Sequence, residues 1–253
     1  MEKYFNVNAD GCSISCKLYA NDPANVRRAI LFGHGFAGHK DNGAAEKLAR
    51  RVLSKSRDAA LITFNWPCHG DDVRKTLRLE DCDRYLGLMI SHIEAAFSAP
   101  ELYGCATSFG GYLFLKYLSE HGNPFKKLAL RCPAVCMYRV ITNGIMTEDD
   151  IAALERGKPV LVGFDRKIRL DKQFVDSLRE ADISLRDLTE FMDDIIIIHG
   201  TEDEVAPFED SRVFADNNLI ELVPVEGADH RFHDPLKMDI AIKRITAFLG
   251  VGI

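Results

Sequence analysis

The chain has 253 residues, of which 47% are hydrophobic and 28% are charged, and its formal net charge at pH 7 is −6. This length is enough to bury a sizeable core, in one large α/β domain or two small ones. The acidic charge, spread along the sequence, excludes the basic footprint of a nucleic-acid-binding protein, and no apolar run is long enough to span a bilayer. Because the first residues lack the layout of a signal peptide, we expect a cytoplasmic protein.

The seven cysteines include no C-x-x-C pair, which is consistent with a compartment where thiols stay reduced. Two pairs, Cys12 with Cys16 and Cys132 with Cys136, have a spacing that would place both side chains on one face of a strand. Such a face could bind zinc. However, cysteine also behaves as a small hydrophobic residue, and these four lie in apolar runs. We therefore expect buried thiols and no metal.

In chain order, the first elements are two alternating stretches, 4–9 and 13–20, which flank Asp10 and Gly11 and predict a β-hairpin. Strands and helices then alternate. The predicted elements are a strand over 28–35, a helix over about 41–56, a strand over 59–66, a helix over 82–97, a strand over 101–108, a helix over 109–121, strands over 126–133, 194–200 and 218–227, and a closing helix that includes Ile242, Ile245 and Leu249. This order predicts an α/β fold with a mainly parallel sheet covered on both faces.

One segment, residues 134–190, breaks this alternation and is too long to be a plain connection. Its pattern predicts short elements: a hairpin over 158–171 around Gly163, and helices over 172–182 and 184–192. Because the α/β pattern resumes afterwards, we expect an insertion rather than a second domain. The core would then consist of residues 1–133 and 191–253.

The stretch ATSFGG follows a predicted strand and opens a predicted helix, which places Ser108 on a tight turn. A serine there is either a nucleophile or an ordinary turn residue. A nucleophile needs a base within hydrogen-bond reach and a carboxylate that orients the base. Asp203 and His230 each follow a later predicted strand, so the sheet would bring all three to one edge.

Other residues compete for these roles. His233 is a second candidate for the base, and the run ADHRFHD could suggest a metal site, although no third cluster of ligands accompanies it. His34, His69 and His199 each precede a glycine at the same predicted edge, and we expect them to shape their loops. The context D-x-V-x-P favours Asp203 over its acidic neighbours.

An acyl-transfer site also needs two backbone N–H groups that stabilise an oxyanion. One would come from Phe109, directly after the serine, and the other from Phe36 or a neighbour in the glycine-containing loop 33–38. That loop also reads as G-x-G-x-x-G, the dinucleotide-binding fingerprint. The next strand ends without an Asp or Glu for a ribose hydroxyl, which disfavours a nicotinamide enzyme. A binding protein that keeps an enzyme fold without its activity is a further alternative.

Five stretches in order, GHGFAGHK, CHG, ATSFGG, HGTEDEVAP and GADHRF, resemble the landmarks of α/β-hydrolases of the esterase and lipase type and span almost the whole chain. The chain looks most similar to bacterial cinnamoyl and feruloyl esterases and to related serine-aminopeptidase-like hydrolases. The resemblance implies an α/β-hydrolase fold, with Ser108 as nucleophile, His230 as base and Asp203 as its orienting acid. It also implies that the insertion is a cap. Ala106 replaces the first glycine of the usual G-x-S-x-G.

The function expected from these residues is hydrolysis of a small-molecule carboxylic ester through an acyl-enzyme, without cofactor or metal. Thioesters and amides remain alternatives. The insertion offers apolar side chains for an aromatic or medium-chain acyl group, and we expect Phe164, Phe174 and Tyr138 to bind substrate. We expect no nucleic-acid or membrane partner, and the sequence is compatible with a homodimer.

Overall fold

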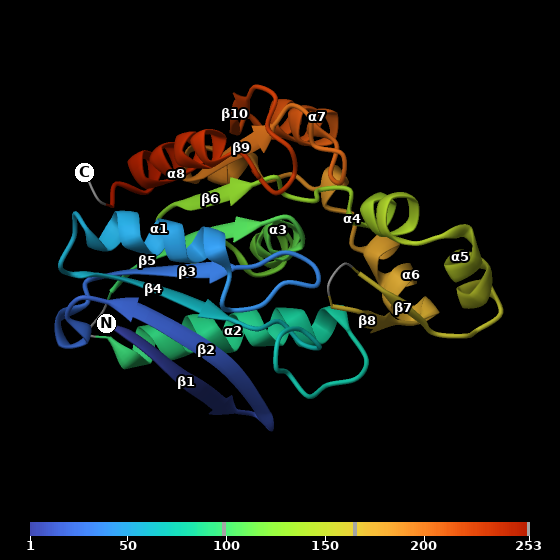
Figure 1. Cartoon of the computed structure of the whole chain (residues 1–253), viewed down its shortest axis with the longest axis horizontal. Helices are drawn as coiled ribbons and strands as arrows, with labels where there is room; N and C mark the ends of the chain where they lie inside the picture. Colours follow the sequence, from blue (N-terminus) through green and yellow to red (C-terminus); the bar gives the residue numbers. More distant parts are fainter. Residues whose placement is uncertain (98–99, 164–165, 252–253) are drawn as a thin grey trace.

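The computed structural model describes residues 1–97, 100–163 and 166–251. Within these ranges its central feature is an eight-stranded sheet in the order β1-β2-β4-β3-β5-β6-β9-β10 (Figure 1). β2 is antiparallel to both β1 and β4, and all other neighbours in this sheet are parallel. The predicted parallel sheet with an N-terminal hairpin is therefore confirmed. The strands are β1 (Glu2–Ala9), β2 (Cys12–Ala20), β3 (Arg28–Gly33), β4 (Ala59–Phe64), β5 (Glu101–Thr107), β6 (Leu128–Arg131), β9 (Ile195–Gly200) and β10 (Glu221–Val225).

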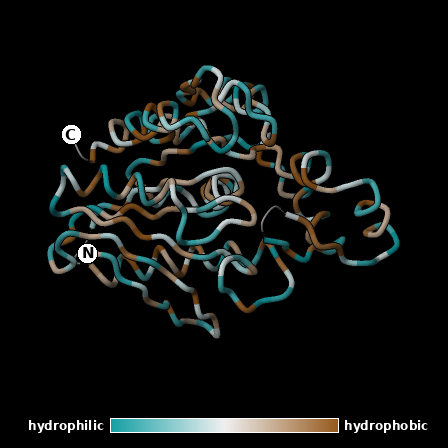
Figure 2. Tube along the Cα trace, in the orientation of Figure 1, coloured by the Kyte–Doolittle hydropathy of each residue, from teal (hydrophilic) through white to brown (hydrophobic). Residues whose placement is uncertain are grey.

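Helices cover both faces of the sheet, which makes it the middle of three layers. Successive residues of a strand point to opposite faces, so both faces of the inner strands are apolar. In β3, Ile30 and Phe32 belong to the apolar cluster that includes residues of α1 and α8, whereas Leu31 belongs to the cluster on the other face, with residues of α2, α3 and α7. Figure 2 shows hydrophobic residues along these central strands. The helices are α1 (Gly43–Leu53), α2 (Leu79–Ala96), α3 (Phe109–His121), α7 (Phe208–Asn218) and α8 (Pro235–Leu249).

The segment between β6 and β9 forms a lobe beyond the carboxyl ends of the parallel strands (Figure 1). Its elements are α4 (Met137–Arg139), a π-helical turn η2 (Val140–Ile145), α5 (Glu148–Glu155), the antiparallel pair β7 (Val160–Val162) and β8 (Ile168–Leu170), α6 (Lys172–Glu180), and two 3-10 turns, η3 (Ile183–Leu185) and η4 (Thr189–Asp194). The lobe thus lies at the edge of the sheet where loops from several strands converge.

Polar contacts and apolar packing fix this lobe to the core. Arg78, just before α2, donates two hydrogen bonds of 2.9 and 2.7 Å to the carboxylate of Asp171. The Tyr112 hydroxyl on α3 donates to the carbonyl of Ala181 at 3.0 Å. Phe174 of α6 is fully buried in the same apolar cluster as α2 and α3. The lobe and the sheet therefore share one hydrophobic core.

Three helical elements differ from the sequence-based expectation. The helix expected over 184–192 is replaced by η3 and η4, because Asp187 accepts the backbone N–H of Thr189 at 3.0 Å and closes a local turn. α5 and α7 were not expected, although Thr147 and Asp150 form a capping box that marks the start of α5.

Among the described helices, none has both the length and the hydropathy needed to cross a bilayer.

Candidate active site

Ser108 lies on a strained turn between β5 and α3. Its φ of 53° and ψ of −120° are unusual for a residue other than glycine. The turn is tight because α3 approaches the end of β3, where a Cβ added to Gly110 would lie 2.5 Å from the carbonyl oxygen of Gly33. Only glycine at position 110 permits this approach. The turn therefore presents Ser108 at the carboxyl edge of the sheet.

Ala106 occupies the position that is glycine in the common motif, and the structure accommodates its methyl group. Ala106 pairs with Gly33 across the parallel strands β5 and β3. A Cβ on Gly33 would lie 3.4 Å from the Ala106 Cβ and 2.8 Å from the Phe114 ring. The glycine at position 33 is therefore required by the Phe114 ring, whereas the Ala106 methyl group would only be in ordinary van der Waals contact with a Cβ there.

The structure brings Ser108, His230 and Asp203 into one hydrogen-bonded chain. His230 Nε2 lies 3.0 Å from Ser108 Oγ, and His230 Nδ1 lies 2.7 Å from Asp203 Oδ2. The three residues follow β5, β10 and β9, whose carboxyl ends meet at one edge. Because an ionised carboxylate only accepts, Nδ1 carries the proton and Nε2 is free to accept from the serine hydroxyl.

Asp203 is held as a buried carboxylate by several donors. Its Oδ1 accepts the backbone N–H groups of Val205 at 2.9 Å and Ala206 at 2.7 Å. Its Oδ2 faces both His230 and His199 Nε2, the latter at 3.0 Å. Burial alone would raise the pKa of Asp203, but the hydrogen bonds from His199 and His230 hold this pKa well below its usual range. The group therefore stays ionised and continues to orient the imidazole.

His199 is a site residue whose contact with Asp203 the sequence did not indicate. It is fully buried, and its Nε2 lies 2.9 Å from the carbonyl oxygen of Ala206 as well as near Asp203. Both neighbours are acceptors, so Nε2 carries the proton. No described residue forms a hydrogen bond with its Nδ1. The only available signal was its spacing, four residues before Asp203 at the end of a buried strand.

The other histidines take different places. His233 is exposed, and its Nδ1 and backbone N–H contact the carboxylate of Asp229 rather than Asp203. His34 and His69 are buried below the loop that follows β3, with their rings 5.4 Å apart. None of these three is recorded in contact with Ser108. The structure thus places His230, and not His233, beside the serine.

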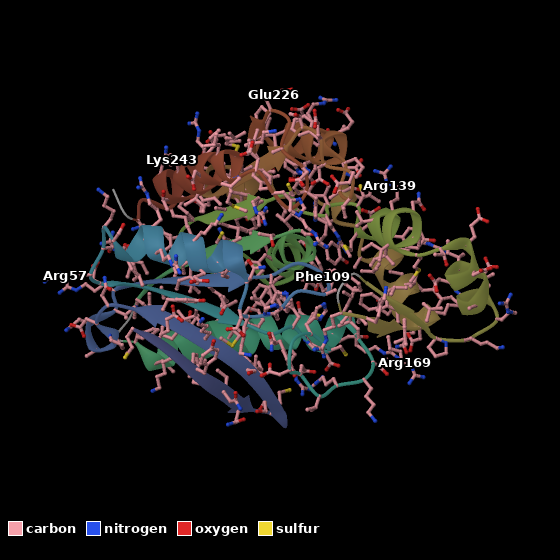
Figure 3. All side chains as sticks on the ribbon, viewed as in Figure 1. Arg57, Phe109, Arg139, Arg169, Glu226 and Lys243 are labelled. Carbon is pink, nitrogen blue, oxygen red and sulfur yellow. The ribbon has the colours of Figure 1, made fainter. Side chains whose placement is uncertain are left out.

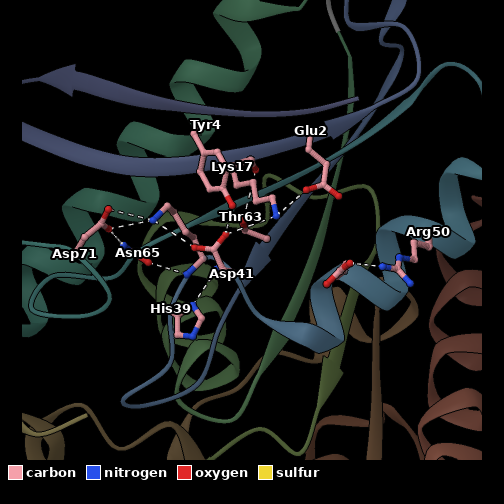
Figure 4. A network of polar contacts seen from close by, with 11 residues as sticks. Glu2, Tyr4, Lys17, His39, Asp41, Arg50, Thr63, Asn65 and Asp71 are labelled. Carbon is pink, nitrogen blue, oxygen red and sulfur yellow. Dashed lines mark hydrogen bonds and ion pairs between the residues drawn. The ribbon is translucent and has the colours of Figure 1, made fainter. Parts of the chain in front are cut away.

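The loop after β3 is fixed next to Ser108 by contacts from the loop after β4. The indole Nε1 of Trp66 donates to the carbonyl of His34 at 2.9 Å, and Asn65 Oδ1 accepts the backbone N–H of Lys40 at 2.7 Å (Figure 4). A Cβ on Gly35 would lie 3.2 Å from the Ser108 Cβ. The backbone of this loop therefore runs directly past the serine.

Two backbone N–H groups flank this position, those of Phe36 and Phe109. Phe109 is the first residue of α3, where the N–H has no partner within the helix. Among the described residues, no acceptor forms a hydrogen bond with either N–H. The two rings meet edge to face at 5.8 Å, and Phe109 lies in the interior between the sheet and the lobe (Figure 3). Both N–H groups are thus available to an oxygen bound beside Ser108.

A cavity of about 760 Å³ lies against Ser108 and His230. Its apolar wall is formed by residues of the lobe and the neighbouring loops, namely Met137, Val140, Ile145 and Val205. Phe36 and Ala37 from the loop after β3 complete the wall. The arrangement therefore places a hydroxyl, an imidazole and free N–H donors at the side of a cavity large enough for a small organic molecule.

Two of the three residues expected to bind substrate, Phe174 and Tyr138, lie outside this cavity. Phe174 is fully buried on the inner face of α6, together with Val175 and Leu178, so it belongs to the core. Tyr138 lines a different cavity, where its hydroxyl contacts Arg179. Phe164 lies outside the described residues. The apolar residues of these short helices pack in the core. A sequence pattern does not distinguish such core residues from residues that line a pocket.

Within the described part of the chain, two groups of side chains could offer ligands to a metal. Cys132, Asp203 and His230 have ligand atoms within 4.8 Å of one another, as do Asp83, Glu120 and His121. A metal in the first group would have to displace the hydrogen bond between His230 and Asp203. Asp83, Glu120 and His121 instead form ion pairs among themselves and with Lys116 at the surface.

Comparisons with known proteins agree on the architecture. No family model matches the chain, and no curated protein matches it in sequence. Est1E from Butyrivibrio proteoclasticus, solved with ferulic acid bound, is 18% identical, with 97% of this chain and 99% of that chain covered and a TM-score of 0.75. An esterase domain from Rhodothermus marinus is 16% identical (98% and 97% covered, TM-score 0.70). A monoacylglycerol lipase from Paleococcus ferrophilus is also 16% identical (93% and 98% covered, TM-score 0.64).

These likenesses extend over nearly the full length of each chain and include the lobe between β6 and β9. They agree with the strand order, the parallel sheet and the antiparallel hairpin. The protein has the α/β-hydrolase fold, the architecture shared by these esterases and this lipase.

Proposed function

We propose that the protein is a serine hydrolase that cleaves carboxylic esters through an acyl-enzyme. The observation that carries this proposal is the hydrogen-bonded chain from Ser108 through His230 to Asp203 beside two free N–H groups. A nucleophile, its base and an oriented acid at the edge of a cavity are the parts that acyl transfer requires. Esterases and a lipase among the proteins of the same fold support the same reaction class.

In the proposed mechanism, Ser108 Oγ attacks the ester carbonyl carbon while His230 Nε2 accepts the hydroxyl proton. Asp203 holds the imidazole in the required tautomer and stabilises the imidazolium. The N–H groups of Phe36 and Phe109 donate to the oxyanion of the tetrahedral intermediate. His230 then protonates the leaving alcohol, and a water molecule activated by His230 releases the acyl group from Ser108.

We propose that the lobe acts as a cap that contributes the acyl pocket. Met137, Val140 and Ile145 come from the lobe and line the cavity next to Ser108. Est1E, whose structure contains ferulic acid, has the same fold. The reaction would therefore favour apolar, aromatic or medium-chain acyl groups over acetyl, by a graded preference of about 1–3 kcal/mol for each extra methylene.

The seven thiols are all free, and six of them are buried. Burial raises the pKa of Cys105 to about 12, so this thiol stays protonated and unreactive. These observations support our proposal that the protein works in a reducing compartment such as the cytoplasm.

A fluorophosphonate probe and a panel of 4-nitrophenyl esters test this function. We expect the probe to label the wild-type protein and not Ser108→Ala, and we expect 4-nitrophenyl butyrate and cinnamate to be cleaved with higher kcat/KM than the acetate. If the probe does not label the wild-type protein and no ester in the panel is hydrolysed, the proposal is contradicted. Equal labelling of the Ser108→Ala variant would mean that another residue is the nucleophile.

A further inference from the structure

The cavity beside Ser108 carries a charge opposite to that of the whole protein. The formal net charge of the chain is −6. Four of the side chains that line the cavity are nevertheless cationic, namely Arg131, Arg166, Lys167 and Arg231. Asp41 is the acidic residue among its described lining residues. Such a concentration of one sign in a concave site attracts a ligand of the other sign.

Asp41 does not neutralise these cations, because other groups already occupy its carboxylate. The Tyr4 hydroxyl donates to Asp41 Oδ1 at 2.7 Å. Lys17 and Lys40 pair with the same carboxylate at 3.6 and 3.5 Å (Figure 4). These partners come from β1, from β2 and from the loop after β3 itself. The carboxylate of Asp41 is therefore paired with groups other than Arg131, Arg166 and Lys167.

Arg131 is the decisive residue, since it is buried and lines the same cavity as Ser108. Arg131 is the last residue of β6, and its backbone carbonyl accepts the N–H of Ser108 at 3.1 Å. The residue is 8% exposed, and its guanidinium lies 5.1 Å from the centre of the Phe232 ring. One guanidinium nitrogen donates to the carbonyl of His230, at a long 3.4 Å.

No described carboxylate lies within ion-pairing distance of Arg131. The carboxylates of Asp203 and Asp229 influence it only at longer range. Burial lowers the pKa of Arg131, but an arginine keeps its charge at any physiological pH. A buried charge without a counter-charge is costly, and arginine has the planar pair of donors that suits a carboxylate or phosphate. A bound oxyanion would supply a counter-charge at short range, which the described residues do not.

We infer that the ester substrate carries an oxyanion group, a carboxylate or a phosphate, that binds the guanidinium of Arg131 when the ester lies against Ser108. This inference rests on the proposed esterase function and narrows its substrate class. The apolar wall of Met137, Val140 and Ile145 would hold the hydrocarbon part of the same molecule.

Two further cations reinforce this field from the lobe. Arg166 and Lys167 are exposed residues in the connection between β7 and β8. This connection lies against the loop after β3, because a Cβ on Gly163 would be 3.2 Å from the Ala37 Cβ. Lys167 Nζ donates to the carbonyl of Gly163 at 2.7 Å, which holds its charge at this position. These cations would increase the rate at which an anionic ester enters, and salt would screen that effect.

Matched ester pairs that differ only in charge provide the test. In the first pair, 4-nitrophenyl hemisuccinate is compared with its neutral methyl ester, which places the charge in the acyl group. In the second, the butyrate ester of 4-hydroxybenzoate is compared with that of methyl 4-hydroxybenzoate, which places the charge in the alcohol. A third compares the butyrate esters of 4-hydroxyphenyl phosphate and of its dimethyl phosphotriester. We expect at least one charged ester to have a kcat/KM about tenfold or more above its neutral partner, as a charge-assisted bidentate contact provides.

Arg131→Met should reduce this charged-to-neutral ratio to about one, and Arg131→Lys should restore part of it. Hydrolysis of the neutral ester in each variant is the internal reference, so a general loss of activity does not count as support. A wild-type ratio of one or less in all three pairs would overturn the inference, as would an unchanged ratio in Arg131→Met.

A second measurement does not depend on how the Arg131 variants fold. In the wild-type protein, the charged-to-neutral ratio should fall as NaCl rises from 0.05 to 0.5 M, and Arg166→Gln/Lys167→Gln should weaken that salt dependence. If the charged-to-neutral ratio of a preferred charged ester changes neither with salt nor with Arg166→Gln/Lys167→Gln, the cationic cavity is contradicted. If instead no neutral or charged ester is cleaved and no fluorophosphonate label appears, the esterase function itself has failed.

Discussion

His199 Nε2 lies 3.0 Å from Asp203 Oδ2, the same oxygen that accepts from His230 Nδ1 at 2.7 Å. Two histidines from different places in the chain therefore share one carboxylate oxygen. Together with the N–H groups of Val205 and Ala206, they fix the carboxylate in one orientation. His199 has no recorded contact with Ser108, so we interpret it as a residue that positions the acid.

The His199→Leu variant should lower kcat for a good ester by about tenfold, since it removes one hydrogen bond to a charged group and loosens the orientation of the imidazole. KM should change little. His199→Gln, whose amide can donate from a similar position, should recover part of the loss. If His199→Leu keeps wild-type kcat while remaining folded, the contact has no role in turnover.

The two histidines of the GADHRFH segment should behave very differently. His230→Ala should lower kcat by about 10⁴ or more, because the nucleophile, base and acid act as a unit. His233→Ala should change kcat less than about threefold, since removal of an exposed pair has a small effect. Steady-state kinetics on one aryl ester distinguishes the two. The opposite pattern would identify His233 as the base.

The backbone N–H of Phe36 can be removed by substitution without breaking a hydrogen bond between described residues. Phe36→Pro lacks this donor and should lower kcat by about 10²–10³. Phe36→Leu keeps the N–H and serves as the matched control, with most of the activity retained. Circular dichroism verifies that both variants fold. Full activity in a folded Phe36→Pro would place the second oxyanion donor at another residue.

The buried His69 should make stability depend on pH. Its Nδ1 donates to the carbonyl of Pro67, and burial lowers its pKa to about 4. In the unfolded chain the ordinary value is about 6.5. Between these values the unfolded state binds a proton that the folded state excludes, so the free energy of unfolding falls as the pH drops from about 6.5 to 4. This one group accounts for up to roughly 3 kcal/mol of the decrease.

Denaturant titrations at pH 7 and pH 4.5 measure this effect. His69→Asn retains a donor for Pro67 but does not titrate in this range, so its stability should vary less with pH than that of the wild-type protein. An identical decrease in the two proteins would mean that His69 is not the group responsible.

Most of the fold could be predicted from the sequence, because the pattern reported local properties. The buried run 28–35 and the stripe of apolar residues from 109 to 121 correspond to β3 and α3, and α3 has the bounds that were predicted. α7 was not predicted, because its charged residues obscure the helical pattern of its buried face, which includes Phe214 and Ala215. α7 packs against β9 and β10, and this tertiary packing stabilises the helix although the sequence pattern does not indicate one.

The candidate site could be predicted only in part. The sequence supplied Ser108, Asp203 and His230 in loops after strands, and the topology of the sheet explains why these loops meet. It did not indicate the contact from His199 or the cationic lining around Arg131, because both depend on which way a side chain turns at the end of a strand.

The identity of the nucleophile is the central claim, and trapping the acyl-enzyme tests it most directly. The protein is mixed with 4-nitrophenyl butyrate, quenched with acid within the first turnovers and measured by intact-mass and peptide mass spectrometry. The account predicts a butyryl adduct on the peptide that contains Ser108, and no adduct with Ser108→Ala. An adduct on a different residue, or turnover by Ser108→Ala close to that of the wild-type protein, would contradict it.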